Sequence, residues 1–167
     1  MMYGREWLPP KIYYEDYESD WSKYEIELYS VFREDFIESK PTYNNKVVTI
    51  RRHPIEFGKE ECFFHVTCVD YNNDGIRVPD FRRCERVRWI RSIIEKADGD
   101  PLAVLIWKKR YKANYRVHLL CESERYMVVL EEREHYCLLI TAFYIEREHT
   151  LRKKLKEYTD YHDSLNK

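Results

Sequence analysis

The chain contains little glycine, only Gly4, Gly58, Gly75 and Gly99 among 167 residues. These glycines form neither a G-x-G-x-x-G nor a G-x-x-x-x-G-K-[ST] motif, which excludes a dinucleotide-binding fingerprint and a P-loop. Long hydrophobic runs are also lacking, because the longest, Tyr136–Ile145, is about half of a membrane span. The N-terminal residues include no apolar segment typical of a secretory signal. We therefore expect a cytoplasmic protein without a membrane partner.

The cysteines provide neither a disulfide framework nor a clear metal site. Their number is odd, five, and no secretory signal accompanies them, so reduced thiols are expected. The one spacing that resembles a ligand pair is Cys62-Phe63-Phe64-His65. This segment is predicted to be a strand, in which residues three apart point to opposite faces. We therefore predict no metal and no cofactor.

Aromatic residues make up 16% of the chain, which argues against disorder although 35% of the residues are charged. The length suits one domain, which we place at residues 19–167. Residues 1–18, with Pro9-Pro10, are predicted to form an extended N-terminal lead-in.

Charge is distributed unevenly along the sequence. Residues 1–45 hold 5 basic and 10 acidic side chains, a net charge of -5, and residues 76–116 hold 12 basic and 5 acidic ones, a net charge of +7. A basic centre on a nearly neutral chain favours a local anion-binding site. The alternative is a solvated face whose charges are balanced by acidic neighbours.

Hydrophobic periodicity predicts an α+β fold, with an antiparallel four-stranded sheet meander and helices packed against it. The predicted helices are Asp20–Glu38, Asp80–Gly99 and Glu146–His162, and the predicted strands are Lys46–Arg51, Cys62–Val69, Leu102–Trp107, Tyr115–Cys121, Tyr126–Leu130 and Tyr136–Tyr144.

The predicted helix after Asp80 carries cations where local rules disfavour them. At 100° per residue, Arg83 falls at the centre of its apolar face and Arg86 at the edge of that face. Arg82 and Arg83 also lie in the first turn, where the helix dipole is already positive. Bound phosphate would explain this placement, and so would ion pairs with the acidic N-terminal helix.

Other candidate site residues lie on the predicted strands. Within Cys62–Val69, His65 is expected on the face opposite Cys62, and Thr141 is expected on the face of Cys137, Leu139 and Phe143. His118 is a second candidate histidine. The segment Trp107–Lys112 interleaves aromatic and basic residues, which suits contact with an RNA backbone and its bases.

The order of several motifs resembles the phage-associated RelE-like nucleases of the barnase, EndoU, colicin and RelE-like (BECR) superfamily. The resemblance spans roughly residues 20–160. It is carried by the motifs Arg52-His53-Pro54, Gly58-Lys59-Glu60, Phe63-Phe64-His65, the block from Arg77 to Arg91, Trp107, Tyr126–Leu130 and Thr141-Ala142-Phe143-Tyr144. It implies a helix on a four-stranded antiparallel sheet and metal-independent RNA cleavage by a toxin or phage-conflict effector, for which a cognate inhibitor protein is an expected partner.

By position, the resemblance implies a site of His65, Arg83, Arg86 and Thr141. In the implied mechanism, His65 takes the proton of a ribose 2′-hydroxyl, the two arginines hold the phosphate and Thr141 bonds one of its oxygens. Lys59 or Tyr144 protonates the leaving 5′ oxygen, and a 2′,3′-cyclic phosphate is produced. The residues expected to bind RNA around this site are Arg77, Arg82, Lys108, Lys109, Arg110, Lys112, Arg116 and His118.

A second interpretation fits the same residues. The basic face would then belong to a non-catalytic module that binds RNA or a protein partner. Cleavage of RNA in excess chelator discriminates between the two interpretations.

Overall fold

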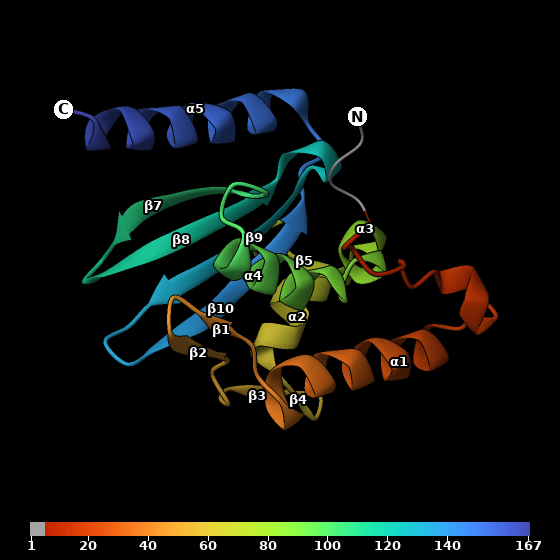
Figure 1. The fold of residues 1–167 in the computed structure, drawn as a ribbon. Coiled ribbons are helices and arrows are strands. Elements are labelled where there is room, and N and C mark those ends of the chain that lie inside the picture. Colours follow the sequence, from red (N-terminus) through yellow and green to blue (C-terminus); the bar gives the residue numbers. More distant parts are fainter. Residues whose placement is uncertain (1–5) are drawn as a thin grey trace.

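The helices and strands of residues 6–167 are described by a computed structural model (Figure 1). The first five residues of the expected lead-in lie outside the described residues. The helices are α1 (Trp21–Arg33), α2 (Glu61–Thr67), α3 (Phe81–Glu85), α4 (Trp89–Gly99) and α5 (Glu148–Leu165), with the shorter helical turns η1 (Tyr14–Tyr17), η2 (Glu34–Glu38) and η3 (Glu122–Glu124). The strands are β1 (Thr42–Tyr43), β2 (Lys46–Thr49), β3 (Ile55–Glu56), β4 (Lys59–Glu60), β5 (Cys68–Val69), β6 (Val78–Pro79), β7 (Leu105–Tyr111), β8 (Asn114–Cys121), β9 (Tyr126–Glu132) and β10 (Tyr136–Tyr144).

The main sheet has six strands in the order β1-β2-β10-β9-β8-β7, so the expected four-stranded antiparallel meander is wrong. Strands β7 to β10 are antiparallel neighbours, but β2 pairs with β10 in parallel, with Tyr136 opposite Val47, and β1 extends the sheet further. Two small sheets, β3–β4 and β5–β6, lie outside it. A strand as short as β2 carries no signal for its partner, because pairing depends on which edge of the folded sheet is free.

Helices cover the two faces of the sheet unequally (Figure 1). One face packs against α1 to α4 in the larger hydrophobic core, which includes Phe32 and Ile90 from the helices and Leu130 from the sheet. The opposite face carries α5, where Leu151 packs near Trp107 in a smaller core. The helix predicted at the C-terminal end therefore forms, although it begins at Glu148.

The N-terminal helix follows the predicted pattern. Asp20 is the N-cap of α1, and its carboxylate accepts a hydrogen bond from the backbone N–H of Lys23 at 3.2 Å. The described part of the lead-in packs on the protein, because Trp89 Nε1 donates to the carbonyl of Pro9 at 2.7 Å and Tyr24 donates to that of Ile12 at 2.7 Å. These bonds position α1 beside α3 and α4.

The segment predicted as the strand Cys62–Val69 is mainly helical, and this changes the geometry of the candidate site. Residues Glu61–Thr67 form α2, and only Cys68 and Val69 are extended, as β5. Almost every side of α2 is buried, so its apolar residues do not show the spacing of a one-sided helix. The predicted opposition of His65 and Cys62 across a strand is therefore wrong.

The second predicted helix is interrupted. Asp80 begins it as expected and accepts hydrogen bonds from the backbone N–H groups of Arg82 and Arg83 at 3.0 and 3.4 Å. α3 ends at Glu85, and α4 begins at Trp89 after a turn. Arg83 lies in α3 and Arg86 in the turn after it, so the prediction that both lie on one face of a single helix is wrong.

A β-bulge changes which side chains of β10 share a face. The register with β9 shifts between Leu139 and Thr141. Ala142, and not Phe143, consequently joins Cys137 and Leu139 in the larger core, while Phe143 packs in the smaller one. The expected common face of Thr141 with Cys137, Leu139 and Phe143 is wrong, because one extra residue reverses the alternation of a strand.

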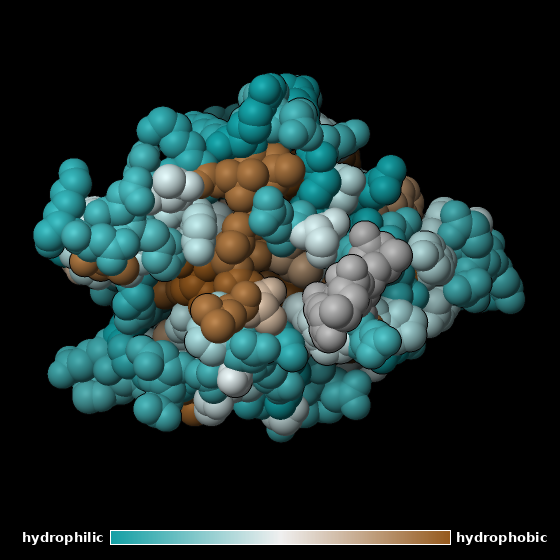
Figure 2. All heavy atoms as spheres, turned by 45° about the horizontal axis from the view of Figure 1, so that its top comes forward, coloured by the Kyte–Doolittle hydropathy of each residue, from teal (hydrophilic) through white to brown (hydrophobic). Residues whose placement is uncertain are grey.

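The surface is mostly hydrophilic, with hydrophobic side chains gathered near the centre of the face that Figure 2 shows. Across residues 6–167, no helix has the length and apolar character needed to cross a membrane.

Candidate active site

A pocket of about 430 Å³ lies where α2 and the segment after β2 meet β10. Beyond Leu138, β10 no longer pairs with β2, and α2 lies beside it, with Cys62 Sγ donating to the carbonyl of Leu139 at 3.4 Å. The pocket is lined by Arg51, His53, Pro54, Glu61, Cys62, His65, Arg116, Leu139, Ile140 and Thr141. Two imidazoles, two guanidinium groups, a carboxylate and a hydroxyl thus come together from four separate parts of the sequence.

His65 and Glu61 form the best-defined pair in this pocket. They lie one turn apart on α2, and His65 Nε2 is 2.9 Å from Glu61 Oε1. The His65 side chain is 41% exposed, so a ligand can reach it. An imidazole held by a carboxylate has a fixed ring orientation, which suits proton transfer to or from a bound substrate.

The other oxygen of Glu61 faces Arg77. Arg77 Nη2 is 3.9 Å from Glu61 Oε2, and Nη1 pairs with Glu56 of β3. The structure therefore places Arg77 beside the expected site, as a residue that connects the Glu61 carboxylate to β3. Its charge is balanced by two acidic neighbours.

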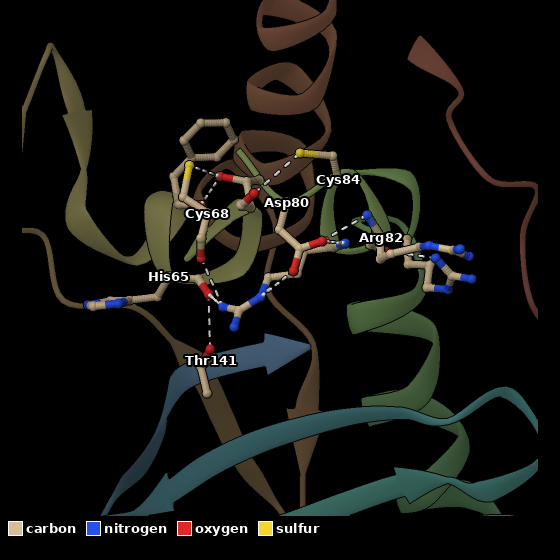
Figure 3. Close-up of polar contacts among 10 residues, drawn as sticks. His65, Cys68, Asp80, Arg82, Cys84 and Thr141 are labelled. Carbon is tan, nitrogen blue, oxygen red and sulfur yellow. Dashed lines mark hydrogen bonds and ion pairs between the residues drawn. The ribbon is translucent and has the colours of Figure 1, made fainter. Parts of the chain in front are cut away.

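The backbone of His65 is held by two side chains that were expected to contact phosphate. Thr141 Oγ1 donates to the carbonyl of His65 at 2.9 Å, and Arg83 Nη1 donates to the same carbonyl at 2.8 Å. Figure 3 shows the imidazole of His65 pointing away from these contacts, while its carbonyl faces Thr141. The structure thus brings His65 and Thr141 together, with the Thr141 hydroxyl bonded to the backbone.

Arg83 is directed into the fold and does not line the pocket. Besides the carbonyl of His65, its Nη1 reaches the carbonyl of Cys68 at 2.9 Å, and its Nε is 3.4 Å from Asp80 Oδ2. Carbonyls at the C-terminal end of a helix lack intrahelical donors, and a guanidinium satisfies them well. Asp80 supplies the negative charge that makes a cation acceptable in the first turn of α3.

Arg86 is also separated from the pocket. Its side chain is 4% exposed, and its guanidinium lies over the rings of Trp89 and Tyr144, at 5.2 and 4.8 Å from their centroids. It donates to the carbonyl of Arg82 at 2.8 Å and to Glu85 at 3.2 Å. The ion pair of Arg86 is formed with Glu85, the residue before it, and not with the acidic N-terminal helix that was one expected source of partners.

Two residues expected as the general acid lie elsewhere. Lys59 Nζ is 3.4 Å from Glu25 Oε1 of α1 and 5.3 Å from the centroid of the Tyr29 ring. The Tyr144 ring contacts Arg86 and, at 5.5 Å from its centroid, the exposed Arg82. The structure does not bring either residue into the pocket.

The cations of β7 and β8 are largely paired within the protein. Lys108 Nζ is 2.7 Å from Glu132 Oε1, and Lys109 Nζ is 3.1 Å from Glu157 Oε1 of α5. At the end of the hairpin, the Arg110 guanidinium lies over the Tyr115 ring and Lys112 lies over Tyr111.

Arg116 is the one member of this basic group that lines the pocket. Its Nε is 3.4 Å from Glu131 Oε1, and its guanidinium lies 3.5 Å from the centroid of the Tyr111 ring. Glu131 is buried and also bonds Arg133 Nε at 2.8 Å. One carboxylate therefore fixes Arg116 at the edge of the pocket.

His118 lies apart from the pocket under α5. Its ring stacks on Trp107, with centroids 5.1 Å apart and planes 11° apart. Burial, followed by the charge of Lys154, lowers the pKa of His118 to about 4. A buried neutral imidazole in this position is suited to packing, and it is not accessible to RNA.

Among the charged and imidazole side chains of the pocket, three were not predicted as site residues from sequence. Arg51 and His53 follow β2, and Glu61 begins α2. The motif Arg52-His53-Pro54 belongs to the resemblance, but nothing in the sequence shows that this segment folds against β10. The Glu61–His65 pair had a signal in its four-residue spacing, which becomes meaningful only once the segment is known to be helical.

The cysteines are buried and carry no disulfide. Burial raises the pKa of Cys62 to about 12 and that of Cys137 to about 11, so these thiols stay protonated near neutral pH. Within residues 6–167, no three histidine, cysteine or acidic side chains form a group arranged to hold a metal ion.

Comparison of the chain with protein-family models, with curated proteins and with solved structures finds no match. The resemblance to RelE-like nucleases therefore stays a prediction from the motifs.

Proposed function

We propose that the chain is an endoribonuclease that cleaves RNA in the pocket between α2 and β10 without a metal ion. In the proposed reaction a ribose 2′-hydroxyl attacks the adjacent phosphorus. The bond from phosphorus to the 5′ oxygen of the next nucleotide breaks, leaving a 2′,3′-cyclic phosphate and a 5′-hydroxyl. The reaction needs a base for the 2′-hydroxyl, an acid for the 5′ oxygen, and cations for the charge on the phosphate.

The pocket supplies a group for each of these tasks. His65, paired with Glu61, takes the proton of the 2′-hydroxyl, and His53 gives a proton to the leaving oxygen. Arg116 and Arg51 bind the non-bridging oxygens of the phosphate. His53 thus replaces Lys59 and Tyr144 as the proposed acid, because it lines the pocket and they do not.

The observation that carries the proposal is the convergence of two histidines and two arginines on one accessible pocket. His118 and Arg86 are buried in this chain, out of reach of a ligand. His65 and His53 are instead open to solvent beside cations whose charge suits a phosphodiester. An imidazole changes charge between pH 5 and 8, which suits proton transfer under ordinary conditions.

The proposal is tested with purified protein and single-stranded RNA in excess EDTA. Wild-type protein should cleave, and the products should carry cyclic phosphates and 5′-hydroxyls. His65→Asn keeps the size and part of the hydrogen bonding of the side chain but cannot transfer a proton. It should lower the rate by about 10² to 10⁴, which is typical for the loss of a general acid or base.

His149→Asn is the matched control, because His149 is exposed on α5 and does not line the pocket. This variant should cleave at the wild-type rate, whereas His53→Asn should be impaired. A substrate with 2′-deoxyribose at the cleaved position should resist cleavage. Wild-type protein that is inactive in EDTA, or a His65→Asn variant of full activity, would contradict the proposed mechanism.

RNA binding without cleavage in this assay would support the alternative of a non-catalytic module. A role as a toxin or phage-conflict effector, with a cognate inhibitor protein, stays a prediction of the resemblance.

A further inference from the structure

The hairpin of β3 and β4 exposes an aromatic side chain at its tip. Phe57 and Gly58 connect the two strands, and both have positive φ, 50° and 77°. A two-residue turn with two positive φ values is usually formed by Asn-Gly or Asp-Gly, because a bulky side chain is disfavoured in this conformation. Phe57 is nonetheless present, and it is 91% exposed. Neither the turn nor the core explains a phenylalanine there.

The hairpin rises directly from the wall of the candidate pocket. Pro54 and Glu61 flank its two strands, both line the pocket, and the N–H of Glu61 donates to the carbonyl of Pro54 at 3.1 Å. Two residues of extended chain, Ile55 and Glu56, separate Phe57 from Pro54, and the three steps span roughly 10 Å. The Phe57 ring also contacts that of Phe64, the residue before His65, with centroids 6.2 Å apart. A short stretch of a bound chain can therefore reach from the pocket to this ring.

Ion pairs hold the hairpin in place, and exposed arginines lie beside it. Arg77 pairs with Glu56 in β3 and approaches Glu61, the first residue of α2, so one side chain joins the hairpin to the helix that follows it. Arg51 and Arg52, both exposed, precede the hairpin. An exposed ring on a fixed hairpin near cations is the combination with which proteins bind single-stranded nucleic acid, since bases stack on rings while cations follow the backbone.

We infer that Phe57 stacks on an unpaired base of single-stranded RNA whose phosphate backbone enters the pocket at His65. This inference rests on the proposed function and names its substrate class as single-stranded. A base inside a duplex has no free face for the ring. Glu56, Glu60 and Glu61 pair with Arg77 and Arg52, and the exposed Arg51 and Arg52 still present guanidinium groups that suit a polyanion better than an apolar protein surface.

The test measures binding of a 2′-O-methyl oligonucleotide, which cannot be cleaved by 2′-hydroxyl attack. Fluorescence anisotropy compares wild-type protein with Phe57→Ala, Phe57→Leu and Phe57→Trp. Phe57→Ala should weaken binding by about 5- to 150-fold, as expected for the loss of one stacked base. Phe57→Leu should bind as weakly as Phe57→Ala, and Phe57→Trp should restore binding.

Leu102→Ala is the matched control, because Leu102 is 95% exposed between α4 and β7 and does not line the pocket. This variant should bind like wild type, and a duplex of the same length should bind more weakly than the single strand. Unchanged binding by Phe57→Ala would overturn the inference. Wild-type affinity in Phe57→Leu would also overturn it, since it would show an apolar contact, as in a protein interface, in place of stacking.

The two proposals fail in distinguishable ways. If the wild-type protein cleaves nothing, the proposed function fails, while the anisotropy series still decides whether Phe57 stacks on RNA. If cleavage depends on His65 but the Phe57 variants bind RNA with wild-type affinity, the proposed function stands and the inference about Phe57 is wrong.

Discussion

Replacing Arg83 by methionine tests whether this residue serves the fold or contacts a substrate. Met has a similar length and is apolar, so the variant removes the guanidinium without creating a large cavity. Three interactions are lost: the bonds to the carbonyls of His65 and Cys68, at 2.8 and 2.9 Å, and the ion pair with Asp80. The end of α2 would then lack a donor that the rest of α3 cannot provide.

The expected loss follows from the type of bond. Hydrogen bonds from charged donors contribute about 1.5–3 kcal/mol each. The carbonyl of His65 keeps its bond from Thr141, which reduces the loss at that end. We therefore expect the free energy of unfolding to fall by about 3 kcal/mol. For a chain of this size that corresponds to a decrease in Tm of roughly 6–12 °C.

The measurement is calorimetry together with urea denaturation, from which stability is obtained by linear extrapolation. Arg82→Met is the control, because Arg82 lies in the same turn of α3 but its side chain is exposed. This variant should change the free energy of unfolding by less than about 1 kcal/mol, as surface substitutions usually do. If Arg83→Met melts within about 2 °C of wild type, the argument that Arg83 stabilises the end of α2 is refuted.

Two further predictions concern the buried titratable side chains of His118 and Glu131. The pKa of His118 is lowered to about 4 by burial, whereas an unfolded histidine titrates near 6.5. The unfolded chain therefore binds the proton first, and stability should fall by at most about 3 kcal/mol as pH decreases from about 6.5 to about 4. His118→Phe should flatten this part of the stability profile in urea titrations, and an unchanged slope would contradict the assignment. Glu131→Gln should lower the free energy of unfolding by about 2 kcal/mol, because buried Glu131 accepts charged hydrogen bonds from the partly exposed Arg116 and Arg133. Glu134→Gln, at an exposed position, should be silent, and equal melting of the two variants would count against the Glu131 network.

Local signals in the sequence were sufficient for much of the secondary structure. The helix after Asp20 and the N-cap at Asp80 follow from apolar spacing and capping chemistry, which act within a few residues of the chain. The strands from β8 to β10 follow from β-rich runs separated by polar turns. His65 and Thr141, both expected at the site, meet in the structure through the backbone carbonyl of His65, to which the Thr141 hydroxyl donates, and not through its imidazole.

Other features were decided only by the tertiary structure, because they depend on residues distant in the chain. Nearly all sides of α2 are buried against other elements, and in so short a buried segment periodicity does not distinguish a helix from a strand. The place of β2 beside β10 and the bulge before Thr141 depend on strand edges and registers that no local pattern encodes. The hydrogen-bond partners of Arg83 also depend on the tertiary structure, because the carbonyls to which it donates belong to residues 15 and 18 positions away.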